Sequence, residues 1–302
     1  MHLIQRLATP LVVGSCIALL LCVATAHAES DFEKIIKQQN ADNVKGYVQP
    51  IADLFGSNMN AGYIRNAKIP ESGFNFRFDV IAMAAMVKSD QETYMASDPW
   101  GGKFQTATIF GKKGGSSPNP LSPTDPSQAY RGSDGLLSTS IFPFLTPQIT
   151  IGHLYGTEAV IRFVPIPEIS SAKLPKITLF GIGVRHSISQ YFQEIPVDLA
   201  AGFMYNRFSI GDLITVKGYG GMVQASKELA ILLLYGGVQF EKSTLTLTYK
   251  SSLGSDVNID MDGSNVVRGV VGAGLNLGFF KLFADANFGA ITSFTAGFGF
   301  GF

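Results

Sequence analysis

The sequence predicts an all-β fold: a transmembrane antiparallel up-and-down β-barrel of about 12 strands, preceded by an amphipathic N-terminal helix. Charged residues are only 15% of the 302-residue chain, which also contains 33 glycines and 23 phenylalanines, whereas a soluble domain is about a quarter charged. The last nine residues, FTAGFGFGF, alternate at the period of a β-strand. After residue 28 no stretch is apolar for long enough to form a spanning helix, and a closed barrel is the other structure that pairs all its backbone groups in a bilayer.

Residues 1–28 are predicted to be a secretory signal peptide. Arg6 supplies the positive charge, residues 11–23 an apolar run, and residues 26–28 (AHA) a small-residue cleavage site near Ala28. A membrane anchor is the alternative, but the run is shorter than the ~20 residues that cross a bilayer. Both cysteines lie in this segment, so we expect a mature protein without disulfides. The signal peptide and the predicted barrel together indicate the outer membrane of a bacterial cell.

Residues 29–73 are predicted to form an N-terminal helical segment and a linker. Apolar residues recur at helical spacing between Phe32 and Phe55. Pro50 is expected to break this helix or to begin a second short one. The helix is expected to begin at the periplasmic mouth of the barrel, and either to enter the lumen as a plug or to lie beneath the barrel in the periplasm.

Residues 74–302 are predicted to form the barrel, because the period of the apolar residues changes to two at Phe74. Twelve strands are expected, at 74–88, 104–111, 147–155, 158–165, 176–188, 196–206, 212–224, 229–240, 243–252, 265–278, 279–288 and 291–302. With both ends of the barrel in the periplasm, the connection 111–147 would be long and periplasmic. It is therefore expected to fold into the lumen or to contain two further strands near 136–145, which would make 14.

The polar residues of these strands are predicted to face the lumen, and the apolar ones lipid. In 74–79 (FNFRFD) phenylalanine alternates with polar residues, and in 245–250 (LTLTYK) leucine and tyrosine alternate with threonine and lysine. The predicted lumen-lining and selectivity residues are Arg77, Asp79, Arg162, Arg185, Asp198, Lys250, Arg268, Lys281 and Asp285. They are expected either to form internal salt bridges that make the barrel rigid, or to line a constriction that selects small anionic or amphipathic solutes.

The alternation at the C-terminus predicts the closing strand of the barrel, with its aromatic side chains facing lipid. Phe298, Phe300 and Phe302 form its aromatic series. A terminal aromatic residue of this kind resembles the signal by which the barrel-assembly machinery recognises its clients. We therefore predict that these three residues act as the assembly signal.

Four sequence blocks resemble those of an uncharacterised family of outer-membrane barrels, known only as a domain of unknown function. They are MNAGYIRNAK (59–68), TIFGKKG (108–114), GTEAVIRFVP (156–165) and FGIGVRHSIS (180–189). The resemblance implies a barrel in the outer membrane, and no established activity or functional residues. A helix ahead of a barrel is also similar in architecture to the N-terminal hatch of channels that take up long-chain fatty acids and aromatic hydrocarbons.

The predicted function is passive passage or uptake of small hydrophobic or amphipathic solutes. The alternative is an outer-membrane barrel with a closed lumen and a structural or ligand-binding role, and a secreted β-sandwich is disfavoured because it would expose large apolar patches. A lipid hydrolase on the barrel rim, with His153 or His186 as base, is a remote alternative, since no GxSxG motif is present. No enzyme activity, cofactor or metal is expected. The net charge of +0 gives no basis for nucleic-acid binding. The expected partners are outer-membrane lipid, the barrel-assembly machinery and a small-molecule solute.

Overall fold

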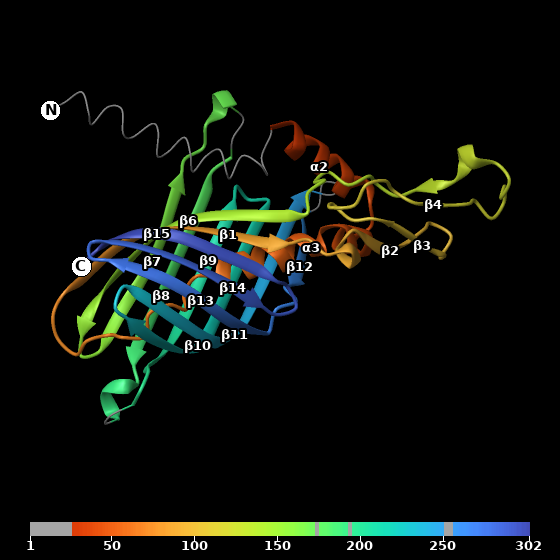
Figure 1. Cartoon of the computed structure of the whole chain (residues 1–302). Coiled ribbons are helices and arrows are strands. Elements are labelled where there is room, and N and C mark those ends of the chain that lie inside the picture. The colour runs from red at the N-terminus through yellow and green to blue at the C-terminus, as the bar shows by residue number, and fades with distance from the viewer. Residues whose placement is uncertain (1–25, 173–174, 193–194, 251–255) are drawn as a thin grey trace.

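The computed structural model describes residues 26–172, 175–192, 195–250 and 256–302, so most of the predicted signal peptide lies outside the described residues. Two helices come first, α2 (Ala26–Gln38) and α3 (Ala41–Asn60). Within the described residues, ten antiparallel strands then form a ring that the β1–β15 and β10–β11 pairs close (Figure 1). In ring order they are β1 (Asn75–Met86), β6 (Ile141–Leu154), β7 (Thr157–Ile166), β8 (Ile177–Ser187), β9 (Asp198–Ile210), β10 (Ile214–Leu229), β11 (Leu232–Lys250), β13 (Val267–Leu277), β14 (Phe280–Phe288) and β15 (Ser293–Gly301).

Five further strands lie outside the ring. β12 (Asp256–Asp262) pairs with the last part of β11 and is followed by β13 on the same edge of that strand. The connection between β1 and β6 holds two small antiparallel sheets, β2 (Thr93–Ser97) with β3 (Lys103–Ala107), and β4 (Ser116–Ser117) with β5 (Tyr130–Arg131). Short 3-10 helices are η1 (Ser89–Gln91), η2 (Pro126–Gln128), η3 (Ser170–Ala172) and η4 (Ser189–Tyr191).

The two ends of the barrel differ in their connections. At the end where β1 begins and β15 stops, here called the C-terminal end, three of the connections are two residues long, at 155–156, 230–231 and 278–279. At the opposite end, here called the loop end, residues 87–140 join β1 to β6. Figure 1 shows α2 and the small sheets at the loop end, away from the C-terminus.

The prediction of 12 or 14 strands was wrong, and two errors account for it. Residues 104–111 were expected to span the barrel, but β3 belongs to the small sheet beyond the loop end. The predicted strands 229–240 and 243–252 are a single strand, β11. Residues 111–140 belong to the long loop-end connection and hold the short strands β4 and β5. The two further barrel strands expected near 136–145 were wrong, because the described residues 141–147 are the start of β6.

The alternation that predicted the outer and inner faces of the final strand is confirmed. Phe294, Phe298 and Phe300 are exposed on the outer face of β15. The intervening glycines face the lumen, where there is no space for a side chain: a Cβ on Gly299 would lie 2.0 Å from an Asp79 oxygen. The glycines of FTAGFGFGF therefore make room for the side chains of neighbouring strands.

The N-terminal helices also differ from expectation. The break lies at residues 39–40, where the Asn40 side chain accepts a hydrogen bond from the Asn43 backbone N–H and caps α3, and Pro50 lies inside the continuous helix α3. α3 begins at the loop end and runs towards the C-terminal end, where the chain enters β1. The expectation that the helix begins at the end of the barrel where the first strand begins was wrong. In the part of the chain that the structure describes, neither helix is both long and apolar enough for a membrane span.

Candidate functional site

α3 and the segment that follows it lie inside the ring of strands (Figure 1), and we call residues 41–69 the plug. Fourteen of the twenty residues of α3 are buried. After the helix, Tyr63, Ile64, Arg65 and Ala67 are buried as well. Of the two places predicted for the N-terminal segment, the lumen is therefore the correct one.

The first half of the plug packs through apolar side chains. Phe55 contacts three phenylalanines of the barrel, with ring centroids 4.6 Å from Phe208 of β9, and 5.2 and 6.1 Å from Phe144 and Phe142 of β6. Val44, Tyr47, Val48, Leu54 and Met59 are fully buried in the same core. Apolar side chains therefore pack this half of the lumen.

The last turn of helix α3 is held by polar side chains of the barrel. Arg162 of β7 donates hydrogen bonds to the carbonyl oxygens of Met59 and Ala61, at 2.9 and 2.8 Å. Arg268 of β13 donates to the Ser57 carbonyl at 2.7 Å, and Gln239 of β11 to the Asn60 carbonyl at 3.0 Å. The last carbonyls of a helix have no partner within the helix, so the barrel supplies the C-cap.

The charges of these arginines are compensated in two ways. Arg268 pairs with Glu241 at 2.7 Å, and Arg185 pairs with Glu158. Among the described residues Arg162 has no carboxylate partner; its guanidinium binds Gln148 at 2.9 Å and lies 3.9 Å from the ring centroid of Tyr63. The negative end of the α3 dipole, together with this ring, therefore serves as the counter-charge of Arg162.

A second cluster of charged and aromatic side chains holds the part of the plug that follows α3. Arg65 of the plug forms an ion pair with Asp79 of β1 at 3.3 Å, and Arg77 binds the same carboxylate at 2.9 Å. The Arg65 guanidinium also lies 3.5 Å from the ring centroid of Phe283. The Arg185 guanidinium donates to the Tyr63 carbonyl at 3.2 Å. The three interactions of the plug itself reach three strands of the wall, β1 through Asp79, β14 through Phe283 and β8 through Arg185.

Small residues of the wall give the plug its space. A Cβ on Gly183 of β8 would lie 3.0 Å from the Tyr63 ring, and one on Gly218 of β10 would lie 2.4 Å from the Asn60 side chain. On the plug side, a Cβ on Gly56 would lie 2.1 Å from the hydroxyl of Ser243. The wall and the plug are thus fitted to each other in shape.

Eight of the nine predicted lumen residues lie on inward positions of the barrel, but they do not line an open bore. Those that contact the plug or pair within the filled lumen are Arg77, Asp79, Arg162, Arg185, Arg268 and Asp285. Asp198 and Lys281 lie at the C-terminal end, where the Lys281 ammonium donates to the carbonyls of Gly278 and Gly301. The ninth prediction, Lys250, was wrong: it is exposed on the outer face at the end of β11, because Leu245, Leu247 and Tyr249 are the buried residues there.

Several residues of this site were not predicted. Glu158 faces the same side of β7 as Arg162, because side chains alternate along a strand. This alternation could have identified Glu158 as an inward residue. Glu241 falls in the assumed break of β11, and Gln239 lies at the end of the predicted strand 229–240; neither was assigned to the lumen. Arg65, Tyr63 and the helix carbonyls lie in the predicted linker and helix, whose position in the lumen no local pattern determines.

The loop end is covered by residues 89–140. The Tyr47 carbonyl of α3 accepts a hydrogen bond from the Ile109 N–H at 3.0 Å, and the Tyr47 hydroxyl donates to the Asp134 carbonyl at 2.9 Å. Burial raises the pKa of the Tyr94 phenol to about 12. Asp98 lies in the β2–β3 turn. Its carboxylate accepts hydrogen bonds from the hydroxyl of Ser117 in β4 and from the backbone N–H groups of Trp100 and Gly102, and these donors lower the pKa of the Asp98 carboxyl group. We call residues 89–140 the cap.

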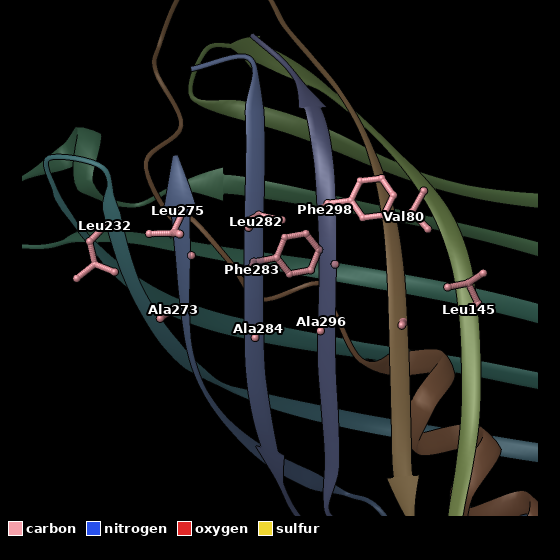
Figure 2. Close-up of a pocket in the computed structure, with 13 residues that line it drawn as sticks. Val80, Leu145, Leu232, Ala273, Leu275, Leu282, Phe283, Ala284, Ala296 and Phe298 are labelled. Carbon is pink, nitrogen blue, oxygen red and sulfur yellow. The ribbon is translucent and has the colours of Figure 1, made fainter. Parts of the chain in front are cut away.

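The outer wall carries an apolar hollow of about 570 Å³ (Figure 2). Ala82, Ala296, Ala284 and Ala273 pair side by side across β1, β15, β14 and β13. Larger side chains surround them, as Figure 2 shows, at Val80, Phe298, Leu282, Leu275, Leu232 and Leu145. The hollow faces away from the plug and offers only apolar contacts at its alanine floor.

A second concavity, of about 1000 Å³, opens at the loop end. It lies between α2, the β7–β8 connection, the β9–β10 turn and the end of β11. Ile210, Leu213 and Tyr249 give it apolar surface, and charged residues lie around them, at Glu33, Lys37, Glu168, Lys176, Asp212 and Lys250. Its size and mixed lining suit a small amphipathic molecule.

His186, considered as the base in the remote alternative of a lipid hydrolase, lies near the C-terminal end of the barrel. Its ring nitrogens are 2.8 Å from the hydroxyl oxygens of Thr157 and Tyr191. Tyr191 is exposed. The histidine thus belongs to a hydrogen-bonded group at the turn that joins β6 to β7.

The model of a family of unknown function (DUF6588) matches residues 7–302. No curated protein matches the chain. Three solved structures show similarity: Ail, the attachment invasion locus protein of Yersinia pestis (10% identity, 76% of this chain and 99% of that chain, TM-score 0.30), the outer membrane protease OmpT of Escherichia coli (10%, 77% and 97%, 0.35) and the toluene transporter TbuX of Ralstonia pickettii (9%, 82% and 97%, 0.30). Identities and scores this low transfer none of their activities to this chain.

Proposed function

The chain belongs to the family of unknown function DUF6588, and we propose that it is a bacterial outer-membrane barrel whose lumen is kept closed by its own N-terminal plug. Its role is then structural or ligand-binding, and it acts at its loop end. The observation that carries this proposal is the C-cap that Arg162, Arg268 and Gln239 of the wall provide for α3.

An uncharged belt on the outer wall supports the membrane location. On β10 the outward side chains between Lys217 and Lys227 are Tyr219, Gly221, Val223 and Ala225. Ten residues of strand span about 34 Å, which a tilt of about 40° reduces to about 26 Å, close to the ~25 Å apolar band of an outer-membrane barrel. By the usual orientation the C-terminal end faces the periplasm and the loop end faces outside.

The apolar half of the plug supports the closed lumen. Exposing each of the fully buried side chains Val44, Val48 and Leu54 to water costs on the order of 1.5–3 kcal/mol. The cap bonds to the same helix. Withdrawal of the plug would therefore cost a large part of the stability of the protein.

Conductance of the refolded mature protein in planar bilayers tests the proposal. The full-length protein is expected to be silent, whereas a variant without residues 29–60 conducts if it folds. Arg162→Met provides a second test that keeps the whole chain: it removes two bonds to the helix end and is expected to give brief openings. Steady conductance of the unaltered protein would show that the plug leaves a path and would reject the closed lumen.

Passive uptake of a small hydrophobic or amphipathic solute is the second candidate function. The loop-end concavity favours it, because its apolar and charged residues suit such a solute. The part of the plug after α3 is held by polar contacts, such as the Tyr63 hydroxyl to Asn206 at 2.7 Å, which water can replace. Swelling of liposomes that contain the protein, in a series of solutes, distinguishes this function from the closed lumen.

The C-terminal aromatic residues are proposed to act in assembly, with the barrel-assembly machinery as partner. Phe298, Phe300 and Phe302 face outward, and the Phe302 backbone pairs with Phe76 to close the barrel. Removal of Phe302 is expected to lower the amount of folded protein in the outer membrane of cells, with Phe163→Ala, another exposed outward residue, as control. Equal amounts of both variants would contradict this role. We propose no enzymatic activity and no cofactor.

A further inference from the structure

Three basic residues lie together on the outer face of three neighbouring strands. Arg207 of β9 is directly opposite Lys217 of β10, and the next outward pair along these strands is Tyr205 with Tyr219. Tyr219 is in turn opposite Lys242 of β11. All three cations are exposed. We call Arg207, Lys217 and Lys242 the basic sector.

Partners within the described part of the chain account for one of the three cations of the basic sector. The Lys242 ammonium pairs with Asp262 at 3.1 Å. In the part of the chain that the structure describes, neither Arg207 nor Lys217 forms an ion pair. Like charges directly opposite on adjacent strands repel each other, so an anion bound between them would remove an unfavourable interaction.

The basic sector lies at the edge of the uncharged belt that is nearer the loop end. On β10 the outward residues towards the C-terminal end are apolar as far as Lys227, and the next outward pair towards the loop end is Thr215 with Ser209. Tyrosine is enriched at the depth of lipid headgroups. The two tyrosines therefore place the cations at the headgroups of the leaflet on the loop-end side.

The rest of the rim shows that the cluster is local. The outward residues near the loop end of β1, β6, β13, β14 and β15 are apolar and exposed: Met86, Ile141, Val267, Phe288 and Phe294. On the side of β8 and β7, the register leads from Arg207 to Phe180 and then to Phe163. A uniform belt of cations at this membrane surface would not have such a distribution.

We propose that the basic sector binds the phosphate group of an anionic lipid headgroup in the leaflet at the loop end. Arg207 presents a planar fork of donors that fits phosphate oxygens, and Lys217 adds a point charge beside it. The hydroxyl groups of Ser209 and Thr215 are further donors one step towards the loop end. The inference rests on the proposed location in a membrane, and it identifies the ligand of one sector of the outer wall.

Lipid binding to the refolded full chain in detergent tests it, with native mass spectrometry to count bound lipid during titration. The probes are phosphatidylglycerol, neutral phosphatidylcholine and inorganic phosphate. The doubly substituted variant Arg207→Gln, Lys217→Gln is compared with Lys103→Gln, Lys227→Gln, which removes the same charge from the cap and from the opposite edge of the belt. Both variants are first checked for folding by the heat-dependent shift on a gel.

The unaltered protein is expected to prefer phosphatidylglycerol to phosphatidylcholine. Loss of two cations weakens phosphatidylglycerol binding about thirtyfold, or about fivefold per charge, and the control variant binds as the unaltered protein does. Equal binding of the two lipids, or unchanged binding by the Arg207, Lys217 variant, would overturn the proposal. Full displacement of the lipid by inorganic phosphate would identify a free anion as the ligand and would also overturn it. A chain that stays folded and monomeric in water without detergent would instead contradict the membrane location itself.

Discussion

The two halves of the plug are held in the same lumen by different physical means. The first half, up to Phe55, packs apolar side chains against Phe142, Phe144 and Phe208. The second half, from Ser57 to Ala67, is bound by directional hydrogen bonds and ion pairs. Apolar burial is large and non-directional, whereas a buried hydrogen bond is specific in position and costly to leave unmade. The first half therefore supplies most of the free energy of closure, and the second fixes the depth of the helix.

Phe55→Ala is expected to have the largest effect, because it empties the aromatic cluster in the first half. Truncation of a buried phenylalanine costs about 3–5 kcal/mol. The chemical denaturation midpoint of the refolded protein in micelles, followed by circular dichroism, should fall accordingly. Phe163→Ala, which alters an exposed phenylalanine on the outer wall, is the matched control. If both variants lose the same stability, the cluster around Phe55 does not carry the first half.

Arg162→Met is expected to have the next largest effect, about 3 kcal/mol, because it leaves buried carbonyls of Met59 and Ala61 without donors. In contrast to Phe55→Ala, it should also disturb the position of the helix end. Hydrogen exchange of amides in the last turn of α3 measures this, and those amides should exchange faster. Arg131→Met, at an exposed arginine in the cap, serves as control. Unchanged exchange at the helix end would mean that Arg162 does not hold the second half.

The outer wall and the C-terminal strand could be predicted from the sequence because each depends on a local pattern. Residues 74–79 and 294–302 alternate with period two, and one side of a membrane strand faces lipid whatever the rest of the chain does. The eight inward residues were found in the same way. Their partners could not be found, because Arg162 and Arg268 bind backbone carbonyls of a helix more than a hundred residues away in the chain.

β11 shows why the strand count failed. From Leu232 to Phe240 its outward residues are apolar, but from Leu245 to Tyr249 the inward residues are the apolar ones. The strand continues past the belt, so its outer face meets water while its inner face packs on the core around α3. The hydroxyls of Thr244, Thr246 and Thr248 donate to side chains of β12 at 2.7 Å on that outer face. A change of surroundings along one strand thus has the same sequence pattern as a turn, which also explains the wrong face for Lys250.

The cap provides the smallest test of the comparison, because it bonds to the apolar half of the plug from outside the barrel. The Asp98 carboxylate accepts hydrogen bonds from the N–H groups of Trp100 and Gly102, at 3.0 and 2.7 Å, and from the Ser117 hydroxyl at 2.6 Å. These donors lower the pKa of Asp98 in the folded cap. Its contribution to stability is therefore fully present above the unfolded pKa of about 4, and is lost as the pH falls through the lower folded value.

Trp100, the single tryptophan of the chain, reports on this turn. Its fluorescence is expected to stay constant from neutral pH down to about 4 and to change below that value. Asp98→Asn should produce the change at neutral pH, whereas Asp90→Asn in η1 of the same cap should not. Circular dichroism of the barrel should remain unchanged in both variants, because the turn lies beyond the ring of strands. If Asp98→Asn instead opens the lumen in planar bilayers, the cap and the apolar half of the plug form one cooperative unit, and the free energy of closure is shared between them.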